Sequence, residues 1–201
     1  PTPPGVATKI IRLANDPEAD MTRIADVLAL DPAITTKILR IANSPMYARQ
    51  RKTENLRQAL MVIGLNATIS LALSFSLLKS WQKQTAGGGL DYPLYWRRAL
   101  LSATASHVLA RTIGVKDGEE LFLACLIQDI GLMALDRTLP DLYKGLDHEQ
   151  VHQAVLIARE TERLGADHAA VSGFLLEQWQ FPERTQQVVA ASHEPERLPK
   201  Q

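Results

Sequence analysis

The sequence predicts an all-α fold made of two helical lobes. Apolar residues recur at three- and four-residue spacing over most of the chain, and capping residues mark the ends of these segments. The consecutive glycines in Thr85-Ala86-Gly87-Gly88-Gly89 cost backbone entropy in any regular element and indicate a linker. We therefore expect an N-terminal helical bundle over residues 1–84, a glycine-rich linker at 85–90 and a C-terminal helical lobe over 91–201.

Capping signals divide the first half into short helices. Residues 6–14 carry apolar positions at helical spacing, and Asp20 is expected to cap a second helix. Asp31 followed by Pro32 is a strong start signal, because an N-cap acceptor precedes a proline in the first turn. Asn43-Ser44-Pro45 is expected to end that third helix. A polar loop at 46–53 and a helix ending at Gly64 follow, the latter burying Leu56, Ala59, Leu60 and Ile63.

Residues 65–78 fit two interpretations. Leucines and other apolar residues alternate with mostly polar ones, which is the period of a half-buried strand. The run is long for a strand, however, and no other segment supplies a convincing partner. Buried helices rich in Leu, Ala and Ser can show the same alternation, so we expect a helix.

The second half predicts five further helices. The first spans about 93–112 and ends at Gly114, and the next spans about 119–135 and carries Asp129. Another is expected over 148–164 with Gly165 behind it. Asp167 is expected to cap the following helix, which reaches about Trp179, and the last helix spans about 183–192.

Charge and cysteine content exclude some classes of function. The chain has 201 residues, with 22 basic and 22 acidic side chains, so it lacks the positive excess of a nucleic-acid-coating protein. Two small basic groups, one around Arg51 and one at Arg97-Arg98, are expected to be solvated surface. The single Cys125 cannot form an internal disulfide, which favours a core position and a reducing cytoplasm. No apolar run reaches the roughly 20 residues of a membrane helix. The start at Pro1-Thr2-Pro3-Pro4 suggests a domain cut from a longer protein.

Two sets of residues, one in each half of the chain, form recognisable motifs. The segment 31–44, DPAITTKILRIANS, through its Asp31, Pro32, Asn43 and Ser44, resembles the DPxLxxxxLxxxNS signature of the HDOD family, the HD-related output domains of bacterial signalling proteins. Residues 59–64 match the helix that follows it. The second set lies in the C-terminal half in the family's order: Trp96, 126–131, Glu160, Gly165, Asp167, His168, Gly173, Trp179, Pro182 and His193. The resemblance covers essentially the whole chain.

The resemblance implies an N-terminal helical bundle and a C-terminal lobe related to HD phosphohydrolases. Such hydrolases place a His-Asp pair on a metal ion, and the related HD-GYP enzymes add a later histidine and a histidine pair. Carried over to this chain, Gln128 replaces the first histidine, Asp129 keeps the carboxylate, and His168 and His193 match later ligands. The upstream histidine near Trp96 is missing, since His107 lies about two helical turns too late.

These losses predict a vestigial metal site formed by Gln128, Asp129, His168 and His193, with no catalytic residues and no cofactor. An amide is a weaker ligand than imidazole for catalytic divalent metals. One metal on the three remaining ligands is chemically conceivable. His148 and His152 would share a face of a helix at metal-ligand spacing, but an exposed helix surface explains them better.

We therefore expect a non-catalytic output domain of a bacterial cytoplasmic signalling protein, acting by inter-domain or protein–protein binding. The resemblance implies partners such as diguanylate cyclase (GGDEF), phosphodiesterase, receiver or kinase modules, or a second copy of the chain, and neither nucleic acid nor membrane. The alternatives are a residual metal-dependent phosphohydrolase and a nucleotide or cyclic-dinucleotide sensor. The loop at 46–53 and the cleft around Asp129 are the two candidate functional surfaces.

Overall fold

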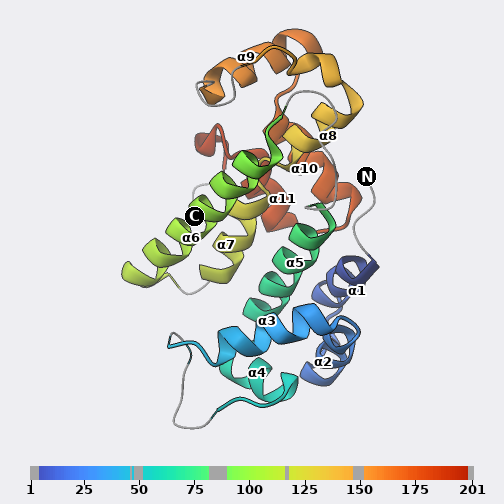
Figure 1. The fold of residues 1–201 in the computed structure, drawn as a ribbon, viewed down its shortest axis with the longest axis vertical. Helices are drawn as coiled ribbons and strands as arrows, with labels where there is room; N and C mark the ends of the chain where they lie inside the picture. Colours follow the sequence, from blue (N-terminus) through green and yellow to red (C-terminus); the bar gives the residue numbers. More distant parts are fainter. Residues whose placement is uncertain are drawn as a thin grey trace.

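The chain folds as an all-α protein, as expected (Figure 1). The structure is a computed structural model that describes residues 5–45, 47, 52–81, 90–115, 118–146 and 152–198, and these contain no strand. The first five helices are α1 (Gly5–Ala14), α2 (Met21–Ala29), α3 (Pro32–Ala42), α4 (Leu56–Ile63) and α5 (Leu65–Trp81). The later ones are α6 (Tyr92–Thr112), α7 (Gly118–Ile127), α8 (Ile130–Thr138), α9 (Gln153–Leu164), α10 (His168–Gln178) and α11 (Glu183–Ala190). Short 3-10 turns lie at Pro140–Leu142 and Pro195–Arg197.

Helix α5 is the centre of the N-terminal half, and its sequence shows why its period is misleading. It contacts α1, α2, α3 and α4, and it also packs on α7 of the second half. Apart from the exposed Asn66, the polar residues in its alternating pattern as far as Leu77 are small and buried. The Thr68 hydroxyl donates to the Gly64 carbonyl and the Ser74 hydroxyl to the Ser70 carbonyl. A helix that is buried all round can alternate in this way, because small hydroxyls satisfy themselves on the preceding turn. The helical prediction for this segment is confirmed.

The signature residues of the N-terminal half are structural. The Asp31 carboxylate accepts the backbone N–H groups of Ala33 and Ile34 and so caps α3. The Asn43 amide accepts the Thr53 N–H and donates to the Thr53 carbonyl, both at 2.8 Å. This pair of bonds ties the end of α3 to the segment that leads into α4. Ser44 accepts the Tyr47 N–H through its carbonyl, within the turn after α3.

The two halves share one hydrophobic core. Buried residues from α1 to α5 and from α6, α7, α8, α10 and α11 belong to the same cluster, with α7 lying against α5, α6 and α11. Trp96 and Trp179 are buried and Cys125 is half-buried against this core, as expected, whereas the side chain of Trp81 lies outside the described residues. Residues 82–89, which include most of the expected linker, also lie outside the described residues, so the division into two lobes stays a prediction.

Three helices differ from the sequence prediction. The single helix expected over 119–135 is broken at Gln128 and Asp129, where Asp129 has φ −104° and ψ 19°. The break reorients the chain so that α8 packs on α10. The helix expected from 148 begins at Gln153 among the described residues, with His152 just before it; His148 and the rest of residues 147–151 lie outside the described residues. The last helix ends at Ala190 rather than 192.

Within the described residues, no single helix is both long and apolar enough to cross a membrane. Only α4 together with α5 as far as Leu77 meets the criteria, as a pair bent by 113°.

Candidate functional site

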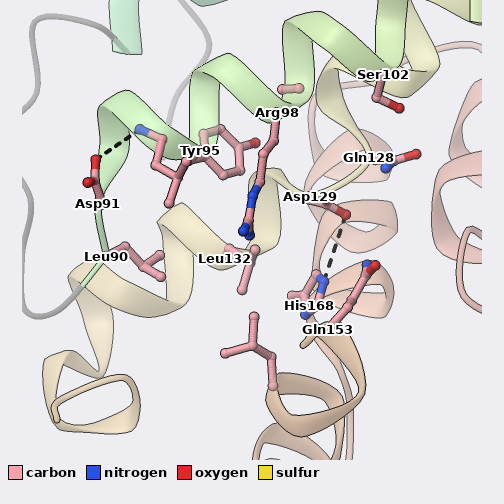
Figure 2. A pocket seen from close by; sticks show the side chains of 13 residues that line it. Leu90, Asp91, Tyr95, Arg98, Ser102, Gln128, Asp129, Leu132, Gln153 and His168 are labelled. Atoms are coloured by element: carbon pink, nitrogen blue, oxygen red, sulfur yellow. Dashed lines mark hydrogen bonds and ion pairs between the residues drawn. The ribbon is translucent and has the colours of Figure 1, made fainter. Parts of the chain in front are cut away.

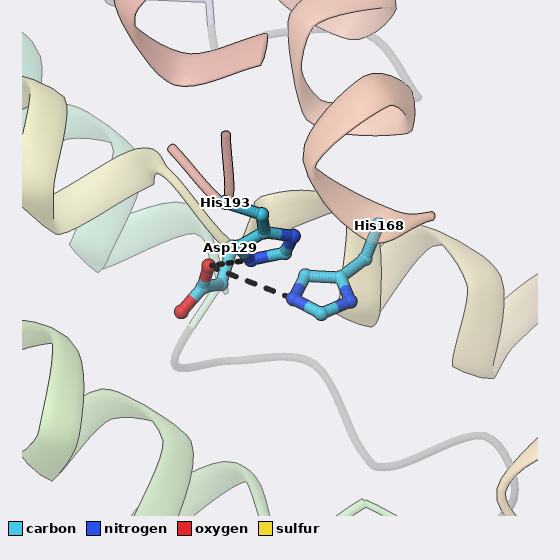
Figure 3. Close-up of side chains that lie close together, drawn as sticks. All are labelled: Asp129, His168 and His193. Atoms are coloured by element: carbon cyan, nitrogen blue, oxygen red, sulfur yellow. Dashed lines mark ion pairs between the residues drawn. The ribbon is translucent and has the colours of Figure 1, made fainter. Parts of the chain in front are cut away.

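The break between α7 and α8 brings Asp129 to two histidines from distant parts of the chain. His168 is the first residue of α10, and His193 follows the end of α11. The Nε2 atoms of His168 and His193 lie 3.7 and 4.0 Å from the same oxygen, Asp129 Oδ1 (Figure 3). The two rings meet edge to face with centroids 4.5 Å apart. We call Asp129, His168 and His193 the triad.

Asp129 occupies the N-cap position of α8 but does not cap it. Its side chain makes no capping hydrogen bond, and the Gly131 N–H of the first turn is instead accepted by the Ser172 hydroxyl at 2.8 Å. That hydroxyl in turn donates to the His168 carbonyl. Because Ser172 satisfies this backbone donor, the Asp129 carboxylate can point towards the histidines instead.

Gly131 makes this packing feasible. A Cβ atom at Gly131 would lie 2.1 Å from the His168 carbonyl oxygen and 2.9 Å from the Ser172 nitrogen, both of them backbone atoms. Only a residue without a side chain lets α8 and α10 approach this closely. The close approach positions Asp129 beside His168.

Glu160 fixes the ring of His168. Its Oε2 accepts the His168 backbone N–H at 2.8 Å and lies 2.7 Å from His168 Nδ1, while its Oε1 accepts the Tyr143 hydroxyl at 2.6 Å. Both side chains are fully buried. A carboxylate that already accepts two donors places the ring proton on Nδ1, so that the Nε2 lone pair faces Asp129.

Asp167 has the same effect on His193. Its Oδ2 lies 2.8 Å from His193 Nδ1, while its Oδ1 caps α10 on the Ala170 N–H. Burial alone would raise the pKa of Asp167, but the hydrogen bonds from Ala170 and His193 outweigh it and lower that pKa. The other ring nitrogen, Nε2, lies 2.6 Å from the side-chain amide nitrogen of Gln153 on α9. Gln153 therefore engages the His193 lone pair that a metal ion would need.

Burial dominates the electrostatics of Asp129. Desolvation raises its pKa, and the neighbouring histidines and a hydrogen bond with Gln128 oppose that rise. Its Oδ1 has no hydrogen-bond partner within the described residues, and the same holds for His168 Nε2 and the Tyr95 hydroxyl.

A cavity of about 250 Å³ opens beside the triad (Figure 2). Its walls include Asp129, His168 and Gln128, together with Tyr95 and Arg98 from α6. The remaining lining residues are Leu90, Asp91, Leu94, Ala99, Ser102, Leu132, Gln153 and Leu156. Figure 2 shows the Arg98 side chain descending from α6 into this space, between Asp129 and Leu132. We call this space the triad pocket.

The triad fits one divalent metal ion and not two. Its three ligand atoms lie within 4.8 Å of one another, and both histidines carry the carboxylate partners typical of metal ligands. Two atoms on one tetrahedral zinc lie about 3.4 Å apart, so the triad would have to contract slightly. In the described part of the chain this is the one such group of three, and Gln128 contributes only a neutral amide to the cleft.

The structure brings together the four residues predicted from the sequence and adds others. Gln128, Asp129 and His168 line the triad pocket, and His193 contacts Asp129. Glu160 carried no predicted role, and Asp167 was predicted only as a cap. Arg98 is exposed, as predicted, and it also lines the triad pocket. A glutamate eight residues before a histidine is only a weak sequence signal for a contact between the two, because the contact depends on how α9 and α10 are connected.

Comparisons with known proteins agree with this fold. A family model described as the HDOD domain matches residues 1–195, and no curated protein matches. An HDOD domain protein of unknown function from Geobacter sulfurreducens has a similar solved structure, with a TM-score of 0.73 and 23% identity over 100% of this chain and 67% of that chain. A solved structure of a protein from Shewanella amazonensis SB2B, described as a phosphohydrolase, has a TM-score of 0.72 and 19% identity to this chain. The match covers 98% of this chain and 70% of that chain.

A protein from Marinobacter aquaeolei VT8, described as a signal transduction protein, gives a TM-score of 0.66 and 22% identity. The match covers 99% of this chain but only 45% of that protein, so the chain spans less than half of its length. At these identities the similar structures show the fold alone, whereas the family model covers nearly the whole sequence. The chain belongs to the HDOD domain family.

Proposed function

We propose that this chain is a non-catalytic output domain of a bacterial cytoplasmic signalling protein, and that it acts by binding. Membership of the HDOD family and the similar fold of a protein described as a signal transduction protein support a signalling role. One observation carries the non-catalytic part. Neutral amides stand where a hydrolase needs strong ligands, since Gln128 lines the cleft beside Asp129 and Gln153 engages the Nε2 of His193.

The proposed partners are other signalling modules: cyclase, phosphodiesterase, receiver or kinase domains, or a second copy of this chain. Longer solved relatives support a place beside further domains, because the chain spans 67% and 45% of two of them. The balance of 22 basic and 22 acidic residues gives no support for a nucleic-acid partner.

A metal-dependent phosphohydrolase is the second candidate, and the orientation of the histidines favours it. Glu160 and Asp167 present both Nε2 atoms to Asp129, which is the arrangement of outer carboxylates seen around catalytic zinc. A metal bound there would lower the pKa of a coordinated water towards neutrality. Asp129, His168 and His193 would hold that metal, after Gln153 had released His193.

Metal analysis combined with a hydrolysis assay separates the two candidates. The wild-type protein, Gln128→His and the control Gln178→His, an exposed position at the end of α10, are each loaded with Zn²⁺ or Mn²⁺ and then desalted. We expect the wild type to retain less than one metal per chain and to leave bis-p-nitrophenyl phosphate intact. Stoichiometric metal together with hydrolysis that disappears in Asp129→Ala would establish the enzyme instead.

A further inference from the structure

The triad pocket contains buried polar atoms that the protein itself does not satisfy. His168 is fully buried, and its Nε2 makes no hydrogen bond within the described residues. The Tyr95 hydroxyl and Asp129 Oδ1 are in the same condition, and both residues line the pocket. Burying a polar atom without a partner destabilises the fold, so such atoms gathered at one cavity indicate a ligand that pairs with them.

Arg98 supplies a permanent positive charge to the same pocket. Its side chain reaches from α6 towards Leu132 and the triad (Figure 2), and it makes no ion pair with any carboxylate of the described segments. Of the two aspartates on the lining, Asp91 accepts the Leu94 N–H and caps α6, and Asp129 Oδ1 lies 3.7 and 4.0 Å from the Nε2 atoms of His168 and His193. The guanidinium is therefore the natural partner of an anionic group, and its planar set of donors matches an oxyanion.

The unmatched atoms of His168 and Asp129 indicate which polar group the ligand presents to them, at the end away from Arg98. In the neutral imidazole of His168 that donates its Nδ1 proton to Glu160, Nε2 is an acceptor, and Oδ1 of an ionised Asp129 is an acceptor as well. Two acceptors at one end of the pocket call for a hydroxyl or similar donor on the ligand. Leu90, Leu94, Leu132 and Leu156 make the remaining walls apolar.

The volume favours a small molecule as the ligand. At about 250 Å³, the pocket lies at or below the lower end of the range for small-molecule sites. A molecule the size of a cyclic dinucleotide would extend out of the pocket into solvent. A small body carrying one oxyanion and one or two hydroxyls matches both the volume and the polar groups.

We propose that the triad pocket binds a small hydroxylated organic anion, a phosphate or a carboxylate, with the oxyanion on Arg98 and a hydroxyl on His168 Nε2 and Asp129 Oδ1. The inference deepens the proposed function and rests on it, because it names the ligand of a cleft that binds without catalysing.

Calorimetric titration in the presence of a chelator tests this with three probes of matched shape: glycerol 3-phosphate, glycerate and glycerol. Arg98→Gln removes the charge in the pocket, and Arg97→Gln removes a neighbouring exposed charge that is not on its lining. We expect at least one of the two anions to bind saturably, at least tenfold more weakly to Arg98→Gln and unchanged to Arg97→Gln, and glycerol not to bind. The two anions distinguish a phosphate site from a carboxylate site.

A second variant tests the unmatched hydroxyl of Tyr95 on the pocket wall. Tyr95→Phe keeps the ring and removes the hydroxyl, so we expect a several-fold loss of affinity with little change in far-ultraviolet circular dichroism. Binding of neither anion, or an equal loss in Arg97→Gln and Arg98→Gln, would overturn the inference. Release of inorganic phosphate from glycerol 3-phosphate would instead overturn the proposed non-catalytic function and leave the binding site in place, so the two failures are distinguishable.

Discussion

Asn43 at the end of α3 and His168 at the start of α10 both belong to the residues that resemble the family, yet they use their polar atoms differently. The side-chain amide of Asn43 hydrogen-bonds the Thr53 backbone and the Leu39 carbonyl, all within its own half of the fold. His168 gives Nδ1 to Glu160 but leaves Nε2 facing a cavity without a partner in the described chain. A residue whose polar atoms are all satisfied internally maintains the fold, whereas one that keeps an atom unmatched is available to a ligand. The N-terminal signature is therefore structural, and the C-terminal triad is the candidate site.

Gly131→Ala should disturb the packing that holds the triad together, and it should have the largest effect on stability. The added Cβ would meet backbone atoms of His168 and Ser172, which cannot rotate away, and we expect a loss of about 3 kcal/mol in the free energy of unfolding. Urea denaturation measures it. Gly5→Ala is the matched control, because its Cβ meets nothing within 4 Å, and a helical alanine should be neutral or slightly stabilising. Equal stabilities for the two variants would show that α8 and α10 can separate freely.

Asn43→Ala tests whether the N-terminal signature stabilises the fold. Losing the paired bonds to Thr53 leaves a backbone donor and acceptor unmatched, and we expect a cost of about 2 kcal/mol. Asn43→Asp, which keeps an acceptor for the Thr53 N–H, should recover part of that loss. Ligand affinity measured calorimetrically at the triad pocket should be unchanged in both, and a tenfold change would remove the distinction between the two regions.

Asp31→Ala tests the other signature residue and should have a smaller effect. Removing the cap from α3 should cost about 1 kcal/mol, because two backbone N–H groups lose their acceptor. Asp26→Ala, at an exposed position within α2, serves as the control and should be close to neutral. Thermal denaturation of the two variants is the measurement. If Asp31→Ala left the stability unchanged, the proline alone would be enough to start the helix.

The smallest expected effect is the pH dependence contributed by Asp167. Its pKa is lowered below the usual 3.8 in the folded protein, so its charged form stabilises the fold above about pH 4. That contribution is lost as the pH falls through the lowered pKa. Asp167→Asn keeps a capping oxygen and removes the charge, so we expect it to be less stable than the wild type by under about 1 kcal/mol at pH 7. The difference should shrink as the pH falls below about 4 in urea denaturation curves, and a constant difference would assign the effect to packing.

Local signals predicted the fold well where they carry their own mechanism. The Asp31-Pro32 start and the Asp20 and Asp167 caps act through backbone donors within three residues, so the sequence is enough to locate those helix ends. The prediction was wrong for the helix over 119–135, because its break depends on Gly131 approaching α10, some forty residues later. The pattern of apolar residues within 119–135 carries no information about that long-range contact, so it could not predict the break.

The candidate site shows the same limit. The resemblance identified Asp129, His168 and His193, and the structure places them together. It gave no role to Glu160, and Arg98 appeared in the sequence only as one of two adjacent arginines on a helix. Its place in the pocket depends on which side of α6 faces α8, which follows from the packing of the whole lobe rather than from the residues around it.

Helix α9 carries a consequence for regulation. It reaches the site with three side chains one or two turns apart, since Gln153 holds His193, Leu156 lines the pocket and Glu160 holds His168. Val155 and Glu162 lie on its opposite side and are exposed. A protein that docks on that outer side and shifts α9 changes the affinity of the pocket. By thermodynamic reciprocity, a ligand in the pocket changes the affinity for that protein by the same factor.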